Sequence, residues 1–243
     1  MAGWRARLGF LIPPGNPTTE PEVIRLTPPG VSVHFTRMVA HGVTGSLDGQ
    51  EERNRTQIAH LDENVALLSM VNPSVMVLAH TATSYTLGKA GEQELVERIQ
   101  RSSGFRFITA FGSVVEALRR LGVERVAVGT PYSEASTQQC KLNLEAHGFK
   151  VVSLGRLAGV QNIYDETPER AYGLARQVDS TEAQAVFLSG VGMPTIETLA
   201  TMEQDLGKPV VSSTAAMMWN ALRIANVGAP INGFGRLLSN PTL

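Results

Sequence analysis

The stretch Val75–Gly88, VMVLAHTATSYTLG, decides the predicted fold of this chain. It begins with an unbroken apolar run, Val75–Ala79, which is typical of a strand buried on both faces of a sheet. His80, Thr81 and further small polar residues follow directly. In an open α/β sheet, ligands bind just beyond the carboxyl ends of the strands. We therefore expect a functional site at His80 and Thr81.

A second stretch, Ala185–Thr195 (AVFLSGVGMPT), repeats this plan with a buried strand and a glycine-containing turn. Each stretch is followed by a helix, a short strand and another helix. The expected ranges are Glu92–Arg101, Arg106–Ala110 and a helix carrying Val115–Arg119 after the first stretch, and Ile196–Leu206, Pro209–Ser212 and a helix carrying Trp219–Arg223 after the second. This order predicts an internal duplication, with the two turns in equivalent places and a cleft between two halves.

The remaining segments continue the alternation of strands and helices. We expect strands at Arg5–Ile12, Val31–Met38, Arg125–Gly129 and Phe149–Leu154, one long helix at Gln50–Met70 and another helix from Pro168. The loop Val39–Gly49 could cover a site, and the tail after Ile224 is expected to pack back irregularly. Alternating strands and helices indicate a mostly parallel, three-layer α/β fold.

Charge and cysteine content narrow the class of protein. The chain has 243 residues, with 21 basic and 22 acidic side chains and a net charge of -1. This balance gives no electrostatic footprint for nucleic acid or for an anionic membrane. The single cysteine excludes an intrachain disulfide framework and a cysteine-based zinc site. Apolar runs are too short to span a membrane, and Pro13 and Pro14 interrupt any leader-like segment, so the expected location is the cytoplasm.

The candidate site residues all follow strands, and each also has a purely structural explanation. Asn16 could cap its own turn, Tyr132 could bury a satisfied hydroxyl, and His80 could bond a neighbouring carbonyl in the core. The turn Gly190–Gly192 offers backbone N–H groups suited to a carboxylate or an enolate oxygen, or it could serve tight packing alone. The common placement of these residues, with Thr81, Asn162 and Ser189, favours one shared site.

Signatures for cofactors and metals are missing from the sequence. There is no GxxxxGK[ST] phosphate loop, no GxGxxG after the first strand and no HExxH, so we expect neither a cofactor nor a metal. Cys140 lies one helical turn from Leu144, which predicts a small core residue rather than a nucleophile.

The sequence resembles the aspartate/glutamate racemase superfamily, and within it the branch of arylmalonate decarboxylase and maleate cis-trans isomerase. The motifs that carry this resemblance are IPPGN at Ile12–Asn16, LAHTATSYTLG, VAVGTPY and LSGVGMPTIETLATMEQDLGKPVVSSTAAMMWNALR. The resemblance implies two pseudo-symmetric Rossmann-like lobes with an active-site cleft between them. Approximate lobes would be residues 1–115 with 213–243, and residues 116–212, in a single unit of 1–243. It also implies cofactor-free chemistry through an enolate-like or covalent intermediate.

The resemblance further assigns roles to particular positions. The two cysteine positions of the superfamily fall at His80 and Gly190, so this chain has neither cysteine, and Gly190 is expected to leave room where relatives carry sulfur. Asn16, Tyr132 and Asn162 fall where the isomerases hold substrate carboxylates, and Thr81 falls where the decarboxylases build an oxyanion pocket. The resulting prediction has His80 and Tyr132 as catalytic residues, and as substrate-binding residues Pro13, Asn16, Thr81, Asn162, Ser189, Gly190, Val191 and Gly192.

Three functions remain open on the sequence. The first is a cofactor-free lyase that decarboxylates a small dicarboxylate or a substituted malonate through an enediolate, with His80 protonating the carbanion. The second is a carboxylate-binding protein that has lost its catalytic thiols. The third is a cis-trans isomerase, which needs a thiolate to add to the double bond. The expected partner is a small carboxylate, and self-association into a homo-oligomer stays open.

Overall fold

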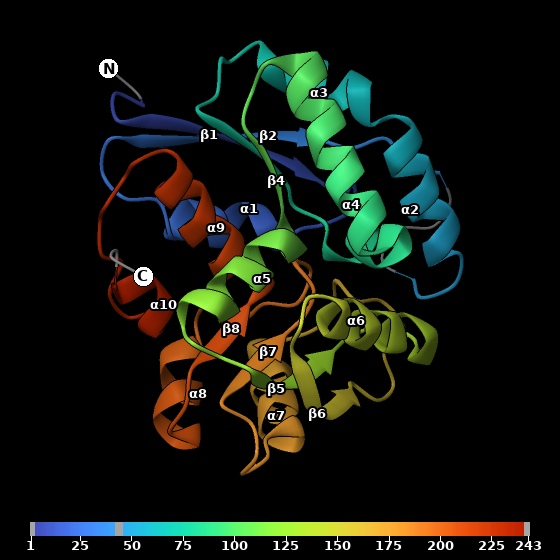
Figure 1. The fold of residues 1–243 in the computed structure, drawn as a ribbon, viewed down its shortest axis with the longest axis vertical. Coiled ribbons are helices and arrows are strands. Elements are labelled where there is room, and N and C mark those ends of the chain that lie inside the picture. The colour runs from blue at the N-terminus through green and yellow to red at the C-terminus, as the bar shows by residue number, and fades with distance from the viewer. Residues whose placement is uncertain (1–2, 42–45, 241–243) are drawn as a thin grey trace.

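The computed structural model describes residues 3–41 and 46–240, and it contains two four-stranded parallel sheets (Figure 1). The strand order is β2-β1-β3-β4 in the first sheet and β6-β5-β7-β8 in the second. The strands are β1 Ala6–Ile12, β2 Val31–Arg37, β3 Val75–Leu78, β4 Phe107–Thr109, β5 Arg125–Thr130, β6 Lys150–Arg156, β7 Ala185–Leu188 and β8 Val210–Ser212. The predicted α/β class with mostly parallel sheets is confirmed.

Helices cover the sheets and fill the space between them. They are α1 Thr19–Arg25, α2 Gln50–Ala59, α3 Leu61–Ser69, α4 Thr81–Ser103, α5 Ala110–Arg120, α6 Glu134–Ala146, α7 Pro168–Val178, α8 Leu199–Leu206, α9 Ser213–Ile224 and α10 Arg236–Ser239. In Figure 1, α2, α3 and α4 lie together beside the first sheet, and α5 and α9 lie near the centre of the molecule. The side chain of Asn220 on α9 donates to Ser113 Oγ on α5 at 3.1 Å, which ties these two helices together.

The first sheet is buried on both faces because its strands alternate between two apolar clusters. Phe10 and Val77 belong to the larger cluster, which continues through the second sheet. Leu11 and Met76 point the other way, into a smaller cluster with Leu61, Val65 and Leu68 of α3 and Leu95 and Ile99 of α4. The apolar run that begins at Val75 therefore is a doubly buried strand, as predicted.

The two sheets share the same strand order, and their central strand pairs end in the same way. Leu11 of β1 pairs with Leu78 of β3, and Gly129 of β5 pairs with Leu188 of β7, each at the end of the β1–β3 or β5–β7 ladder. His80 and Gly190 each lie two residues beyond the second member of their pair. They therefore occupy equivalent places in the two halves, which agrees with the predicted duplication. The proposed lobe boundaries stay a prediction.

Helix α4 begins earlier than the sequence suggested. The polar stretch after His80 was expected to be a loop, but it forms the first turns of α4, which bends at Gly88. Threonine and serine are weak helix formers, and tertiary contacts override that preference here. Two of the hydroxyls find partners outside their own turn: Ser84 donates to Glu92 at 2.6 Å, and Thr86 donates to Glu51 at 2.9 Å.

Three other boundaries also differ from expectation. The single helix expected at Gln50–Met70 is interrupted at His60, whose carbonyl accepts from both the backbone N–H and the side chain of Asn64, at 3.3 and 2.7 Å. Helix α8 starts at Leu199 rather than at Ile196, after a turn. The tail contains the short helix α10. Part of the loop Val39–Gly49 lies outside the described residues. Within the described ranges, no helix is long and apolar enough to cross a membrane.

Candidate functional site

His80 is held at the junction of β3 and α4. Its backbone is extended at the N-cap of α4, and its side chain is 8% exposed. Nδ1 lies 2.7 Å from Thr83 Oγ1, which fixes the orientation of the ring. Burial, and secondly the positive charge of Arg53, lower the pKa of His80 to about 4. The imidazole is therefore neutral near pH 7 in the free protein.

His80 lines a small enclosed pocket built from four segments far apart in the sequence. The loop after β1 supplies Pro13, which was predicted to bind substrate, and α2 supplies a row of polar residues. The loop after β6 supplies Tyr164, two residues beyond the predicted Asn162. The full lining is Pro13, Pro14, Gln50, Arg53, Asn54, Gln57, His80, Ile163 and Tyr164. Of the predicted site residues, only Pro13 and His80 line this pocket directly.

Thr81 and Gly190 belong to a buried chain of hydrogen bonds. Thr81 Oγ1 lies 3.0 Å from Ser213 Oγ, which also accepts from the backbone N–H of Gly190 at 3.1 Å. Ser213, at the start of α9, therefore links the two equivalent loops. The N–H of Gly190, predicted to face a substrate oxygen, already has a protein partner.

Ser189 and Tyr132 lie beside this chain. The hydroxyls of Ser189 and Tyr85 are 2.7 Å apart, and the rings of Tyr85 and Tyr132 meet edge to face with their centroids 6.3 Å apart. Burial raises the pKa of Tyr132 well above its ordinary value, so this phenol stays protonated and can act only as a neutral donor or acceptor.

Gly190 has a backbone conformation that side chains resist. Its φ is +106°, and an added Cβ would lie 3.1 Å from the Tyr132 hydroxyl and 3.2 Å from Pro131 Cγ. The positive φ and these close contacts favour glycine here, so an added side chain would be strained. The expectation that Gly190 leaves room where relatives carry sulfur stays a prediction.

Asn16 works mainly as a connector between the halves. Its Oδ1 accepts from the N–H groups of Thr18 and Thr19 at 2.8 and 3.0 Å, and its Nδ2 donates to the Val191 carbonyl at 3.3 Å. Thr19 Oγ1 donates to the same carbonyl at 2.9 Å, and Thr18 Oγ1 donates to the Gly192 carbonyl at 3.1 Å. The predicted residues Asn16, Val191 and Gly192 are thus brought together, with their side-chain and carbonyl groups largely bonded to one another.

Asn162 is half-buried and shapes the loop that carries Tyr164. Its Oδ1 accepts from the Tyr164 N–H at 3.1 Å, and its backbone forms an isolated antiparallel bridge with Ser46. A Cβ on Gly192 would lie 2.8 Å from Tyr164 Cε1, so the glycine allows the ring to approach. Tyr164 therefore connects the Gly192 turn to the pocket of His80.

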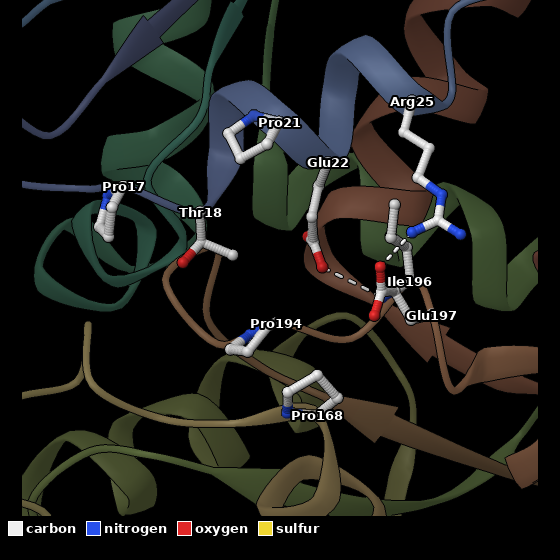
Figure 2. Close-up of a pocket in the computed structure, with 9 residues that line it drawn as sticks. All are labelled: Pro17, Thr18, Pro21, Glu22, Arg25, Pro168, Pro194, Ile196 and Glu197. Carbon is white, nitrogen blue, oxygen red and sulfur yellow. Dashed lines mark hydrogen bonds and ion pairs between the residues drawn. The ribbon is translucent and has the colours of Figure 1, made fainter.

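A second hollow lies next to α1, outside the predicted site (Figure 2). Its wall is rich in prolines, and Glu22 points from α1 toward the loop that contains Ile196. Glu22 Oε1 accepts from the N–H groups of Thr195 and Ile196 at 2.6 and 3.0 Å, and Arg25 pairs with Glu197. Glu22 Oε1 and the Arg25–Glu197 pair are therefore bonded within the protein, whereas Glu22 Oε2 has no hydrogen-bond partner among the described residues. Among the described residues, no group of three histidine, cysteine or acidic side chains could hold a metal.

Comparison with known proteins agrees with this architecture. The arylmalonate decarboxylase family model matches residues 8–238, which is nearly the whole chain. The chain belongs to the arylmalonate decarboxylase family. The resemblance to the branch of arylmalonate decarboxylase and maleate isomerase is thereby confirmed.

Relatives of the decarboxylase family include both kinds of enzyme. A maleate isomerase of Nocardia farcinica is 31% identical over 249 residues, which cover 96% of this chain and 95% of the relative. An arylmalonate decarboxylase of Bordetella bronchiseptica is 29% identical over 170 residues, covering 68% and 70%. A solved structure of the Nocardia farcinica maleate cis-trans isomerase with a covalently bound succinylcysteine intermediate superposes with a TM-score of 0.86 at 25% identity, covering 96% of this chain and 98% of that one.

Sequence reasoning missed four residues of this candidate site. Ser213 lies directly after the N-cap Ser212 of α9, and nothing in its local sequence marks it. Tyr164 lies in the loop after β6 and carries no motif. Arg53 and Gln57 lie on the long helix predicted at Gln50–Met70, in which the apolar residues at helical spacing begin only at Ile58. The absence of an apolar stripe before Ile58 was the available signal that the buried face of α2 is polar.

Proposed function

We propose that the protein is a cofactor-free lyase that decarboxylates a small dicarboxylate or a substituted malonate through an enediolate. The observation that carries the proposal is the imidazole of His80 in an enclosed pocket that the buried residue Arg53 also lines. Family membership supports it, because relatives include a decarboxylase of arylmalonates and isomerases of maleate. The roles of the individual residues below are part of this proposal.

A bound carboxylate would change the protonation of His80. The negative charge offsets the two influences that lower its pKa, so the ring takes up a proton as the anion binds. Loss of CO₂ leaves the electron pair of the broken C–C bond in an enediolate. His80 then donates its proton to the carbanion carbon and is reprotonated from water. One carboxylate becomes one CO₂, and one proton is consumed.

Thr81, Tyr132 and the backbone of Gly190–Gly192 would stabilise the developing oxyanion. A single well-placed donor of this kind contributes about 3 kcal/mol to lowering a barrier. Ser213 already accepts from Gly190 N–H, so a substrate oxygen must share or replace that bond. Asn16, Asn162, Pro13, Ser189 and Val191 would shape and hold this part of the site.

Isomerase chemistry through a cysteine adduct finds no suitable thiol here. The chain has one cysteine, Cys140, which is buried in α6 and does not line the pocket of His80. Burial raises the pKa of this thiol to about 12, so a reactive thiolate is scarce at neutral pH. The isomerase alternative is for this reason weaker than the lyase.

A carboxylate-binding protein without turnover is the second candidate. It is favoured by the neutral state of His80 and by the protein partner already held by Gly190 N–H. Turnover separates the two functions: the lyase releases CO₂ from a malonate that it binds, and the binding protein does not.

The deciding experiment compares His80→Gln with the wild type. We expect the variant to bind a substituted malonate within a few-fold of the wild type but to release CO₂ roughly 10²–10⁴ times more slowly. Cys140→Ala serves as the control and should keep its turnover, since that thiol lies in the packed core. Full turnover in His80→Gln on every accepted substrate would rule out the proton-donor role.

The pH dependence gives an independent check on the same residue. A donor must be protonated, and the pKa of free His80 is about 4. The kcat/KM value should therefore fall about tenfold per pH unit once the pH exceeds both that value and the pKa values of the free substrate, because it reports the free enzyme and the free substrate. The kcat value reports the complex and should stay level to higher pH.

We also propose a cytoplasmic location and self-association into a homo-oligomer, which size-exclusion chromatography with light scattering would measure. The single cysteine and the balanced charge support the first of these.

A further inference from the structure

Helix α2 buries a polar face. Its four buried residues are Gln50, Arg53, Asn54 and Gln57, spaced three or four residues apart on one side of the helix. A helix packed on a protein core normally buries an apolar stripe. Burying polar groups is costly unless they find partners. All four residues line the pocket that contains His80. Part of the face is also bonded to neighbouring helices, since Asn54 donates to Thr86 on α4 and Gln50 accepts from Ser136 on α6.

Arg53 contributes a positive charge beside this pocket, and the carboxylate of Asp48 offsets that charge only from beyond ion-pair distance. Arg53 is 8% exposed, and it donates to the carbonyl oxygens of Asp48, at 2.5 Å, and Ser46. Carbonyls satisfy donors but do not neutralise the charge. None of the ion pairs among the described residues includes Arg53. The other titratable groups that line the pocket, His80 and Tyr164, are neutral near pH 7.

Two amides present acceptor atoms to the same pocket. Asn54 Nδ2 is 3.0 Å from Thr86 Oγ1 and 3.4 Å from the Ala82 carbonyl, which fixes Oδ1 as the free atom. Asn54 Oδ1 and Gln57 Oε1 are both buried and have no hydrogen-bond partner among the described residues. A ligand that completes this pocket therefore supplies hydrogen-bond donors as well as a negative charge.

We propose that the buried face of α2 recognises a carboxylate whose neighbouring carbon carries a hydroxyl or amino group. Arg53 pairs with the carboxylate, and the oxygens of Asn54 and Gln57 accept from the donor. The assignment of such an acid as the substrate rests on the proposed decarboxylase function. A malonate with a hydroxyl on the reacting carbon meets both requirements, whereas an aryl group would meet only polar side chains and a small space.

Titration calorimetry with hydroxymalonate, malonate and phenylmalonate tests this recognition without any need for turnover. We expect hydroxymalonate to bind the wild type about tenfold more tightly than malonate, because only the former has the donor. Phenylmalonate should bind most weakly. Arg53→Met should weaken the binding of hydroxymalonate by at least about tenfold, the usual effect of losing a hydrogen-bonded buried charge partner.

Arg55→Met is the matched control. Arg55 lies on the exposed side of the same helix, where it pairs with Glu51, so this variant loses the same charge away from the pocket. Its affinity should stay within about twofold of the wild type. Equal affinities in Arg53→Met and Arg55→Met, or equal affinities of the wild type for malonate and hydroxymalonate, would overturn the proposal.

Gln57→Leu covers the case in which Arg53→Met does not fold. Because Gln57 Oε1 has no protein partner, its loss should leave the melting temperature nearly unchanged and reduce the preference for hydroxymalonate over malonate. An unchanged preference in this folded variant would count against the proposal.

Release of CO₂ from hydroxymalonate is then measured separately. Binding that depends on Arg53 without CO₂ release supports the recognition site and contradicts the lyase. CO₂ release with the same affinity in both arginine variants supports the lyase and contradicts the recognition site.

Discussion

His80 illustrates how surroundings set the chemistry of one side chain. In water its imidazole would be partly protonated near neutral pH. Here burial and the nearby guanidinium of Arg53 favour the neutral ring. Such a histidine carries no proton to donate near pH 7 until a bound anion raises its pKa. In the proposed reaction, substrate binding therefore also protonates the proton donor.

The same shift makes the stability of the protein depend on pH. The pKa of His80 is about 4 in the folded state, below the ordinary value of 6.5, so between these values the unfolded chain binds a proton that the folded chain does not. The stabilising contribution of neutral His80 is present above pH 6.5 and is lost as pH falls toward 4. Its size is about 3 kcal/mol, from about 1.36 kcal/mol per pKa unit.

Urea unfolding of the wild type and of His80→Gln at pH 7 and pH 4 measures this contribution. The difference in unfolding free energy between the two proteins should shift by about 3 kcal/mol, to the disadvantage of the wild type at pH 4. Subtracting the variant cancels the buried carboxyl groups of Glu22, Glu92 and Glu203, whose raised pKa values act in the opposite direction. A difference that is constant with pH would contradict the lowered pKa.

The backbone conformation of the turn after β7 limits which residues can occupy position 190. Gly190→Ala forces a side chain into φ +106° and toward the Tyr132 hydroxyl. We expect a loss of roughly 1–3 kcal/mol in the free energy of unfolding, the usual range for such strain. Gly173→Ala in α7 is the control, because nothing lies within 4 Å of an added Cβ there, and it should be neutral or stabilising. Thermal unfolding of both variants decides the matter.

Strands were easier to predict than helix starts, and α4 explains why. The apolar run of β3 identifies the strand because burial on both faces leaves no other pattern. The residues from Thr81 to Tyr85 have low helix propensity, and they become helical through contacts with distant residues such as Ser213 and Ser189. Such contacts cannot be read from local sequence. For the same reason, the hydrogen bonds that connect Thr81 to Gly190 through Ser213 could not be predicted from the sequence.

The placement of His80 next to Pro13 could be predicted because both follow neighbouring parallel strands, β3 and β1. The part played by α2 could not, because a helix between β2 and β3 can pack at many angles. Only its unusual polarity pointed to a site.

The two halves of the molecule are joined by more than the shared apolar cluster. Glu22 accepts from two backbone N–H groups in the loop after β7. The side chains of Asn16, Thr18 and Thr19 donate to backbone carbonyls of the same loop. We expect Glu22→Ala to lower the free energy of unfolding by about 2–4 kcal/mol, since two buried donors lose their acceptor. Glu22→Gln keeps an acceptor oxygen and should lose much less.

Glu197→Gln is the surface control for this measurement. It breaks the exposed ion pair with Arg25 and should cost no more than about 1 kcal/mol. Calorimetry should also show one transition for each folded variant, because the larger apolar cluster runs through both sheets. Two separated transitions in the wild type would mean that the halves unfold independently.

The equivalence of His80 and Gly190 in the two halves has a stereochemical consequence. Only one of the two positions carries a group that can deliver a proton, so a prochiral carbanion held between them would receive it from one face. Decarboxylation of hydroxymalonate in D₂O should then give a single enantiomer of monodeuterated glycolate, measurable by chiral derivatisation and NMR. A racemic product would mean that water, and not the imidazole, supplies the deuteron. The difference between a histidine at one of the two equivalent positions and a glycine at the other would thus set the handedness of the product.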